Sequence, residues 1–398
     1  MIPSCPVCDE RRWDSILHGQ APLNTVTDLH GDGGDRRRMD YHLVRCAACG
    51  HLYNRAFDDG LVGAMYTDVP LTNVPVHPSM LTRLQDLSEW LDVDGLSGKN
   101  VVEIGCGSGH LARILAMRAA QVRLYEPNRN LRPEMLAEAN IQLHQGLFTS
   151  DDARDPADLV ICRQVLEHVA DPLALLRIIR KALRPDGRVY LEVPDAAFIE
   201  AHASFSDLHQ QHVQYFTIGN LIRLARAAGL HPWRVLSIKD GHDMGVLLQG
   251  EPRPDPLSAF PDRSVSESGL AARLAARLAA TRRTVAGLRG RIALYGANAY
   301  GQSFFNATEG IGRYDHVFDD TQALIGRYGL FGVNTTLPIR EPTPEALARC
   351  DSVIVCAYLH DTAICERIRG KGFSGRVLTI RPSPLPAGAS ALTSVYDA

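Results

Sequence analysis

The stretch "DLHQQHVQYF" at 207–216 holds two histidines three positions apart. Neutral imidazole is an effective base near neutral pH, because its unperturbed pKa is about 6.5. His212 is therefore a candidate base, and His209 shares its face if the stretch is helical. Tyr215 could donate a hydrogen bond to a developing oxyanion. Two other interpretations stay open: a solvent-facing helix start capped by Asp207, and a metal site, for which the neighbouring sequence offers no third ligand.

Four cysteines form two C-x2-C pairs, "CPVC" at 5–8 and "CAAC" at 46–49. Four thiolates complete the tetrahedral shell of a structural zinc ion and leave no position open for water. The segment around them is polar and rich in turns, so a metal would supply the stability that a small core cannot. We predict structural Zn²⁺ on Cys5, Cys8, Cys46 and Cys49, with unrelated reduced thiols as the alternative.

A glycine-rich loop follows an apolar run in "VVEIGCGSGHLARIL" at 101–115, and a helical pattern follows the loop. Glycine lets the backbone turn sharply and come close to a ligand. The spacing is E-x-G-x-G-x-G, which differs from the dinucleotide pattern G-x-G-x-x-G. The next apolar run ends in "LYEPN", where the carboxylate of Glu126 can accept hydrogen bonds from two ribose hydroxyls.

This loop resembles motif I of the class I S-adenosylmethionine-dependent methyltransferases. The resemblance implies S-adenosyl-L-methionine as cofactor. The cofactor-binding residues it implies are Glu103, Gly105, Gly107, Gly109, Glu126, Pro127, Phe148 and Gln164. "CRQVLEHVADP" places His168 just beyond a strand, where open α/β sheets bind ligands, so His168 is a candidate catalytic residue. The alternatives are a packed histidine there and a nucleotide-binding domain that has lost its ligand.

A second strand, glycine loop and helix begin at "RIALYGANAYGQSFF". The alternation of apolar runs and helical stretches predicts an α/β fold with mostly parallel sheets in both regions. The predicted parts are a zinc module at 1–70, a methyltransferase domain at 71–250, a proline-rich linker at 251–268 and a second Rossmann-like domain at 269–398. A long helix is expected at 270–288, ended by Gly290.

This order of parts resembles the nucleotide-sugar C-methyltransferases of deoxysugar biosynthesis. The resemblance implies methylation of a carbon beside a ketone: a base removes a proton, and the enolate attacks the sulfonium methyl group. That family has Tyr-His-Glu-His before an aromatic pair. Its last histidine falls on His212, its glutamate on Gln211, its tyrosine on His209 and its aromatic pair on Tyr215 and Phe216. Gln211 can orient His212 but carries no charge.

The same resemblance implies a nucleotide-linked sugar as substrate. The substrate-binding residues it implies are Tyr66, His77, Gly296, Asn298 and Tyr300. Two other activities stay open. One is methyl transfer to oxygen or nitrogen of another small metabolite on the same scaffold, and the other is a non-catalytic protein that binds the cofactor.

The composition limits the partners. A formal net charge of −3 argues against nucleic acid as a partner. The sequence contains neither a signal-peptide pattern nor an apolar run long enough for a membrane span. Nine cysteines without a secretion signal indicate reduced thiols. We therefore expect a cytoplasmic enzyme that is a monomer or a weak homo-oligomer.

Overall fold

The structure is a computed structural model. It describes residues 1–22, 26–28, 38–68, 74–75, 78–92, 95–136, 138–252, 269–330, 332, 336–382 and 393–394. His77 and most of the predicted linker, 253–268, lie outside this part of the chain. Contacts divide the chain into two compact units. Unit 1 is 1–15, 42–197 and 211–266, and unit 2 is 16–41, 198–210 and 267–398.

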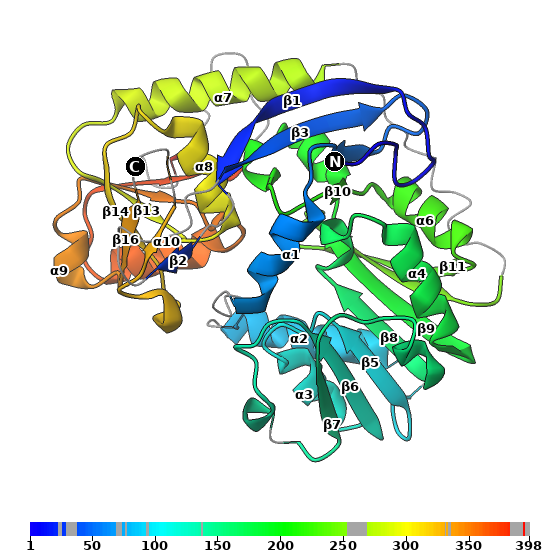
Figure 1. Cartoon of the computed structure of the whole chain (residues 1–398). Coiled ribbons are helices and arrows are strands. Elements are labelled where there is room, and N and C mark those ends of the chain that lie inside the picture. The colour runs from blue at the N-terminus through cyan, green and yellow to red at the C-terminus, as the bar shows by residue number, and fades with distance from the viewer. Residues whose placement is uncertain are drawn as a thin grey trace. The chain divides into compact units, whose positions relative to one another are not determined.

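Unit 1 contains a seven-stranded sheet with the order β11-β12-β9-β8-β5-β6-β7 (Figure 1). The strands are β5 (Asn100–Ile104), β6 (Gln121–Glu126), β7 (Ile141–Gln145), β8 (Ala157–Arg163), β9 (Leu183–Pro194), β11 (His231–Ile238) and β12 (Asp243–Gln249). The five strands from β7 to β9 are parallel, β12 pairs antiparallel with β9, and β11 pairs antiparallel with β12. This sheet confirms the predicted α/β architecture of the region.

Helices cover both faces of this sheet, with α2 (Pro78–Leu91) and α3 (His110–Ala116) on one face and α4 (Pro172–Lys181) and α6 (Ile218–Ala227) on the other. Two further helices are α1 (Asp59–Asp68) and α5 (Ala196–His202). Successive strand residues point to opposite faces. Val101 accordingly packs in a cluster with leucines of α2 and α3, and Val102 packs in a cluster with residues of α4 and α6. The apolar runs are therefore nearly continuous, as in strands that are buried on both faces.

The cysteine module shares the core of unit 1. A four-stranded sheet has the order β1-β3-β4-β10, with β1 (Trp13–Pro22), β3 (Arg38–Cys46), β4 (Leu52–Asn54) and β10 (Gln214–Tyr215). Cys46 and Tyr53 belong to the same buried cluster as Val102 of β5. The module is thus packed against one face of the seven-stranded sheet.

Unit 2 contains an eight-stranded sheet with the order β19-β18-β17-β13-β14-β16-β15-β2. Its strands are β2 (Val26–Asp28), β13 (Ile292–Tyr295), β14 (Tyr314–Phe318), β15 (Tyr328–Gly329), β16 (Leu337–Arg340), β17 (Ser352–Val355), β18 (Arg376–Thr379) and β19 (Thr393–Ser394). Its helices are α7 (Leu270–Gly287), α8 (Ala299–Thr308), α9 (Pro344–Leu347) and α10 (Asp361–Gly370). The five central strands are parallel, which confirms a second α/β fold. Within the described ranges, no helix combines the length and apolar character that a membrane crossing requires.

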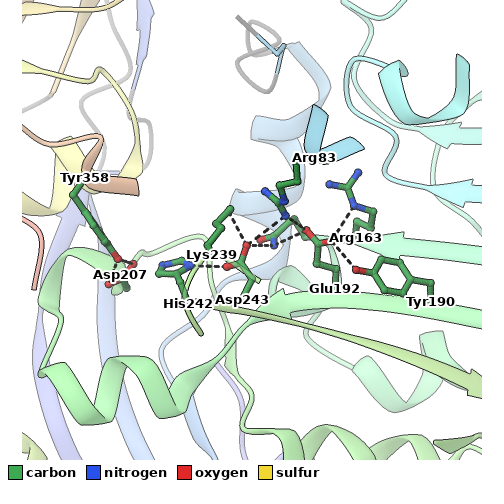
Figure 2. Close-up of polar contacts among 10 residues, drawn as sticks. Arg83, Arg163, Tyr190, Glu192, Asp207, Lys239, His242, Asp243 and Tyr358 are labelled. Carbon is green, nitrogen blue, oxygen red and sulfur yellow. Dashed lines mark hydrogen bonds and ion pairs between the residues drawn. The ribbon is translucent and has the colours of Figure 1, made fainter. Parts of the chain in front are cut away.

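The stretch at 207–216 is not helical. A short 3-10 helix (η4, Phe205–Asp207) ends at Asp207, turn residues follow, and β10 starts at Gln214. Asp207 is buried and accepts hydrogen bonds from Tyr358 Oη at 2.8 Å, instead of capping an exposed helix (Figure 2). His209 and His212 therefore do not share a helix face, and the two residues belong to different units.

Candidate functional site

The first glycine loop connects β5 to α3 in a conformation that requires glycine. Gly105, Gly107 and Gly109 have φ of 68°, 58° and 72°. These angles lie in the left-handed region that other residues adopt at a cost. A Cβ on Gly105 would overlap Val165 Cγ2, and one on Gly109 would lie 2.7 Å from Leu136 Cδ2. The loop therefore makes the sharp turn that its glycines permit, and Gly105 and Gly109 leave no room for a side chain.

Glu126 lies directly against this loop. The Gly107 N–H donates to Glu126 Oε2 at 2.7 Å, and the Asn128 N–H donates to Oε1 at 3.0 Å. Pro127 follows at the end of β6, and a strand cannot continue through its missing N–H. A carboxylate has further lone pairs, so Glu126 can accept hydroxyl hydrogen bonds while it holds the loop. The nearby Phe148 ring is buried and packs edge-on against Tyr125, with centroids 4.8 Å apart.

Glu103 on β5 is the buried acidic residue of the loop motif. Burial raises its pKa to about 7, although Arg163 opposes that shift. Its Oε2 has no hydrogen-bond partner among the described residues. Glu103 therefore sits close to the boundary between its neutral and charged forms at physiological pH.

Gln164 marks the carboxyl end of β8. Its φ of 52° is unusual for a residue other than glycine. Its N–H donates to the Glu192 carbonyl at 2.7 Å, and its side-chain Nε2 donates to Asp243 Oδ2 at 3.2 Å. A strained residue at the end of a central strand is typical of ligand-binding sites in α/β folds.

A buried network of charged residues is centred on Glu192 (Figure 2). Gln164 joins it, because its Nε2 donates to Glu192 Oε1 at 3.5 Å. Glu192 accepts hydrogen bonds from Arg83 Nη2 at 2.7 Å, from Arg163 Nε at 3.3 Å and from Tyr190 Oη at 2.9 Å. Burial would raise the pKa of Glu192, but the two arginines hold it below its ordinary value. The sequence motifs do not predict this network. Its one local signal is the glutamate inside the apolar run "VYLEVP".

Asp243 at the start of β12 extends this network. Lys239 Nζ lies 2.7 Å from Oδ2, and His242 Nδ1 lies 2.5 Å from Oδ1 (Figure 2). Burial opposes ionisation, yet these two partners hold the pKa of Asp243 below its usual range. The carboxyl edge of the central strands is therefore charged and hydrogen-bonded, as a site for a polar ligand requires.

Four side chains of unit 1 converge just beyond β8, around the short 3-10 helix η3 (Leu166–His168). Tyr66 Oη lies 2.8 Å from His168 Nδ1, and the Gln211 carbonyl oxygen lies 2.9 Å from the same nitrogen. The rings of His168 and His212 meet edge to face, with centroids 4.7 Å apart. Glu167 Oε1 is 3.9 Å from His168 Nε2. We call Tyr66, Glu167, His168 and His212 the acceptor cluster.

Desolvation favours the neutral forms of two members of the acceptor cluster. It lowers the pKa of His168 to about 4 and raises the pKa of Glu167 well above its ordinary value. Neither carboxyl oxygen of the buried Glu167 has a hydrogen-bond partner within the described residues. Ligand atoms of Glu167, His168 and His212 all lie within 4.8 Å of one another, a set that could hold a metal ion. The expectation that His212 lacks further ligands nearby is therefore wrong.

The structure places the other predicted residues as follows. Tyr215 is buried on β10, with its ring centroid 5.9 Å from that of His212. In unit 2, His209 packs edge-on against Tyr300 at 5.2 Å. Gly296 has a φ of 112°, and Asn298 Oδ1 caps α8 by accepting from the Gly301 N–H at 3.0 Å. Gln211 contributes its backbone carbonyl to the acceptor cluster through the contact with His168.

The four predicted metal ligands form one compact cluster. The Cys5 and Cys49 sulfurs are 3.6 Å apart, and those of Cys8 and Cys46 are 3.5 Å apart. Zn–S bonds of about 2.3 Å in a tetrahedron place sulfurs about 3.8 Å apart, so the set fits zinc. These distances are far longer than a disulfide bond, and all nine cysteines are free thiols. Hydrogen bonding by Cys5 lowers the pKa of Cys49 to about 5, and the same hydrogen bond raises the pKa of Cys5, while burial raises that of Cys8.

Comparison with known proteins agrees with the geometry of the glycine loop. Residues 76–235 match a family described as "Methyltransferase domain". A ubiquinone biosynthesis O-methyltransferase of Aeromonas salmonicida is 30% identical over 174 residues, 39% of this chain and 72% of that protein. Its counterpart in Idiomarina loihiensis is 36% identical over 104 residues, 24% of this chain and 43% of that protein.

Solved structures give a more distant likeness. The magnesium protoporphyrin IX methyltransferase of Synechocystis PCC 6803, with bound SAH, is 17% identical. The match covers 44% of this chain and 89% of that one, with a TM-score of 0.35. On its sequence matches and its α/β core, this chain belongs to the S-adenosylmethionine-dependent methyltransferases.

Proposed function

We propose that the chain transfers a methyl group from S-adenosylmethionine to a carbon beside a ketone in a nucleotide-linked deoxysugar, with His212 as the base. The observation that carries this proposal is the acceptor cluster and its place in the fold. Val165, directly before η3, packs so closely on Gly105 that a Cβ there would overlap it. His168 follows three residues after Val165, and its ring contacts that of His212. Both imidazoles are therefore connected to the segment that packs on the loop proposed to hold the methyl donor.

The residues around the glycine loop would bind the donor. Glu126 would accept the ribose hydroxyls, Phe148 would pack on the adenine, and Gln164 would face the methionine end. Glu103 would support the loop from beneath. Because the sulfonium is already electrophilic, the protein needs only to align the acceptor and remove one proton.

The contacts of His168 fix its tautomer. A backbone carbonyl can only accept, so the contact with Gln211 places the proton of His168 on Nδ1. The Nδ1–H is then shared between the Gln211 carbonyl and Tyr66 Oη. The phenol proton of Tyr66 remains available to another acceptor. Burial raises the pKa of Tyr66, so the phenol stays neutral. It would donate to the oxygen of the enolate as negative charge develops there.

The charges in the cluster suit a base at His212. His168 stays neutral, so it does not repel the imidazolium that forms when His212 removes the substrate proton. Glu167 brings a carboxyl group close to His212 from a different segment of the chain. The adjacent Gln211 has an uncharged amide side chain and cannot supply one. The positive charge on His212 would favour the ionised form of Glu167 and would be stabilised by it.

Methyl transfer to a panel of nucleotide-linked keto-sugars tests this proposal. With donor labelled with carbon-13 in the methyl group, NMR of the product distinguishes a methyl bonded to carbon from one bonded to oxygen. We expect a carbon-bound methyl with at least one keto-sugar. His212→Asn should lower kcat by about 10²–10⁴-fold, the usual contribution of a general base. The matched control is His231→Asn, on β11, which should leave kcat unchanged.

Methyl transfer to oxygen is the second candidate, and the similarity to ubiquinone biosynthesis O-methyltransferases favours it. His212 would then remove a hydroxyl proton. An oxygen-bound methyl in the product, lost in His212→Asn, would support this candidate and exclude carbon methylation.

A further inference from the structure

We propose that the four-cysteine module positions the acceptor cluster, with Gln214 as the positioning residue that joins them. All the residues involved belong to unit 1. The role of the cluster in the reaction rests on the proposed function, but the structural coupling does not.

The segment that follows His212 is part of the sheet of the cysteine module. β10 pairs antiparallel with β4, with Gln214 opposite Tyr53 and Tyr215 opposite Leu52. The Asn54 N–H also donates to the Val213 carbonyl at 2.8 Å. β4 begins three residues after the predicted metal ligand Cys49. The second C-x2-C pair, Cys46–Cys49, therefore leads directly into the strand that pairs with this segment.

The same segment is bonded on its other side to the loop of Glu167 and His168. The Val213 N–H donates to the Glu167 carbonyl at 2.8 Å. The side-chain Nε2 of Gln214 donates to the Val169 carbonyl at 3.1 Å. Both histidines of the acceptor cluster are therefore held by backbone that is bonded to residues 213–214.

Gln214 connects this segment to the second C-x2-C pair through His51. Its Oε1 lies 2.8 Å from His51 Nε2, and the His51 carbonyl accepts from the Cys46 N–H at 2.9 Å. Gln214 is 1% exposed and His51 is fully buried. The Gln214 amide accepts and donates at once, a combination that neither a carboxylate nor an apolar side chain provides.

Through these hydrogen bonds, the second C-x2-C pair helps to fix the positions of His168 and His212. A buried polar group that loses its partner is unfavourable by more than the hydrogen bond contributes. Replacing Gln214 with methionine, which has a similar size, would leave the His51 Nε2–H and the Val169 carbonyl unpaired. The two backbone segments would then open more often without any change in the cysteines.

Hydrogen–deuterium exchange on the full chain with bound S-adenosylhomocysteine tests this coupling. In Gln214→Met, peptides covering 166–170 and 211–216 should exchange at least about tenfold faster, equivalent to about 1.4 kcal/mol. Peptides covering 100–126 should be unchanged, with the metal content and the affinity for S-adenosylhomocysteine within about twofold of the native values. The matched control is Gln142→Met, an exposed glutamine of β7.

Removing the metal with EDTA provides an independent arm on the native chain. We expect peptides at 211–216 to lose protection in the same titration as those at 42–54. Full protection of 166–170 and 211–216 in Gln214→Met, or after EDTA has opened 42–54, would overturn the proposal. If EDTA unfolds the whole unit, Gln214→Met decides the question. In steady-state assays, Gln214→Met should have a kcat about tenfold lower than the native chain, with a KM for S-adenosylmethionine within about twofold of the native value.

Discussion

Replacing Gly105 with alanine should have two effects, backbone strain and a steric clash. The same replacement at Gly98 should cause the strain alone, so the two variants separate the effects. Gly105 has a φ of 68° and Gly98 a φ of 75°, so alanine is strained by a similar amount at either position. A left-handed backbone costs an L-residue about 1–2 kcal/mol. At Gly98 no atom lies within 4 Å of the added Cβ, so Gly98→Ala should lower the free energy of unfolding by that amount alone.

Gly105→Ala has a steric effect as well, because its Cβ would overlap Val165 Cγ2. Valine is β-branched and has few χ1 rotamers, so the Val165 side chain cannot easily turn away and its backbone must move instead. Overpacking of this kind costs about 1–3 kcal/mol, which gives about 2–5 kcal/mol in total. The displaced segment begins at Gln164, so the affinity for S-adenosylhomocysteine should fall by about tenfold or more.

Urea unfolding and calorimetric titration with S-adenosylhomocysteine measure both effects. The difference between the two variants in free energy of unfolding isolates the contact with Val165. Equal destabilisation of Gly105→Ala and Gly98→Ala, with the affinity intact in both, would refute the close packing of the loop against the end of β8.

Three further predictions follow from single residues. Because burial raises the pKa of Glu103 to about 7, the folded state holds its proton more tightly than the unfolded state. Between pH 4.5 and 7 this group should therefore cost up to about 3 kcal/mol of stability as the pH rises, and urea titrations of Glu103→Gln should lack this component. Gln211→Glu should keep kcat within about threefold, since the contact to His168 is made by the backbone carbonyl. A loss of about tenfold or more would instead place the side chain in the chemistry. Cys8→Ala should lower the zinc content well below one per chain, measured by mass spectrometry of the native protein, and unchanged zinc would exclude Cys8 as a ligand.

Local signals predicted the elements that position the cofactor. The apolar runs of β5, β6, β8 and β13 are buried on both faces, so their sequence is continuous and apolar, and each ends at glycine or a polar residue. The positive φ values of the glycine loop follow from the glycine spacing itself. The α7 helix follows from alanine, leucine and arginine, which are strong helix formers. The predicted domain boundaries and residue roles stay predictions.

The acceptor cluster depends on contacts between distant segments, which spacing cannot predict. The sequence placed His168 at a strand end and His212 in a polar stretch, but nothing local indicates that their rings meet. The sequence left a helix start at 207–216 open as one alternative, and the structure excludes it because Gln214 and Tyr215 pair with β4. The Glu192 network combines side chains from α2, β8 and β9, so only the tertiary structure reveals it.

Solvent deuterium incorporation into a nucleotide-linked keto-sugar tests the central claim most directly. With S-adenosylhomocysteine in place of the methyl donor, the base can remove the proton but no methyl can be transferred. The native chain should exchange the proton beside the ketone, and His212→Asn should exchange it about 10²–10⁴-fold more slowly. Exchange at the native rate in His212→Asn, or methyl transfer to the same sugar without any exchange in the native chain, would contradict the assignment of His212 as the base.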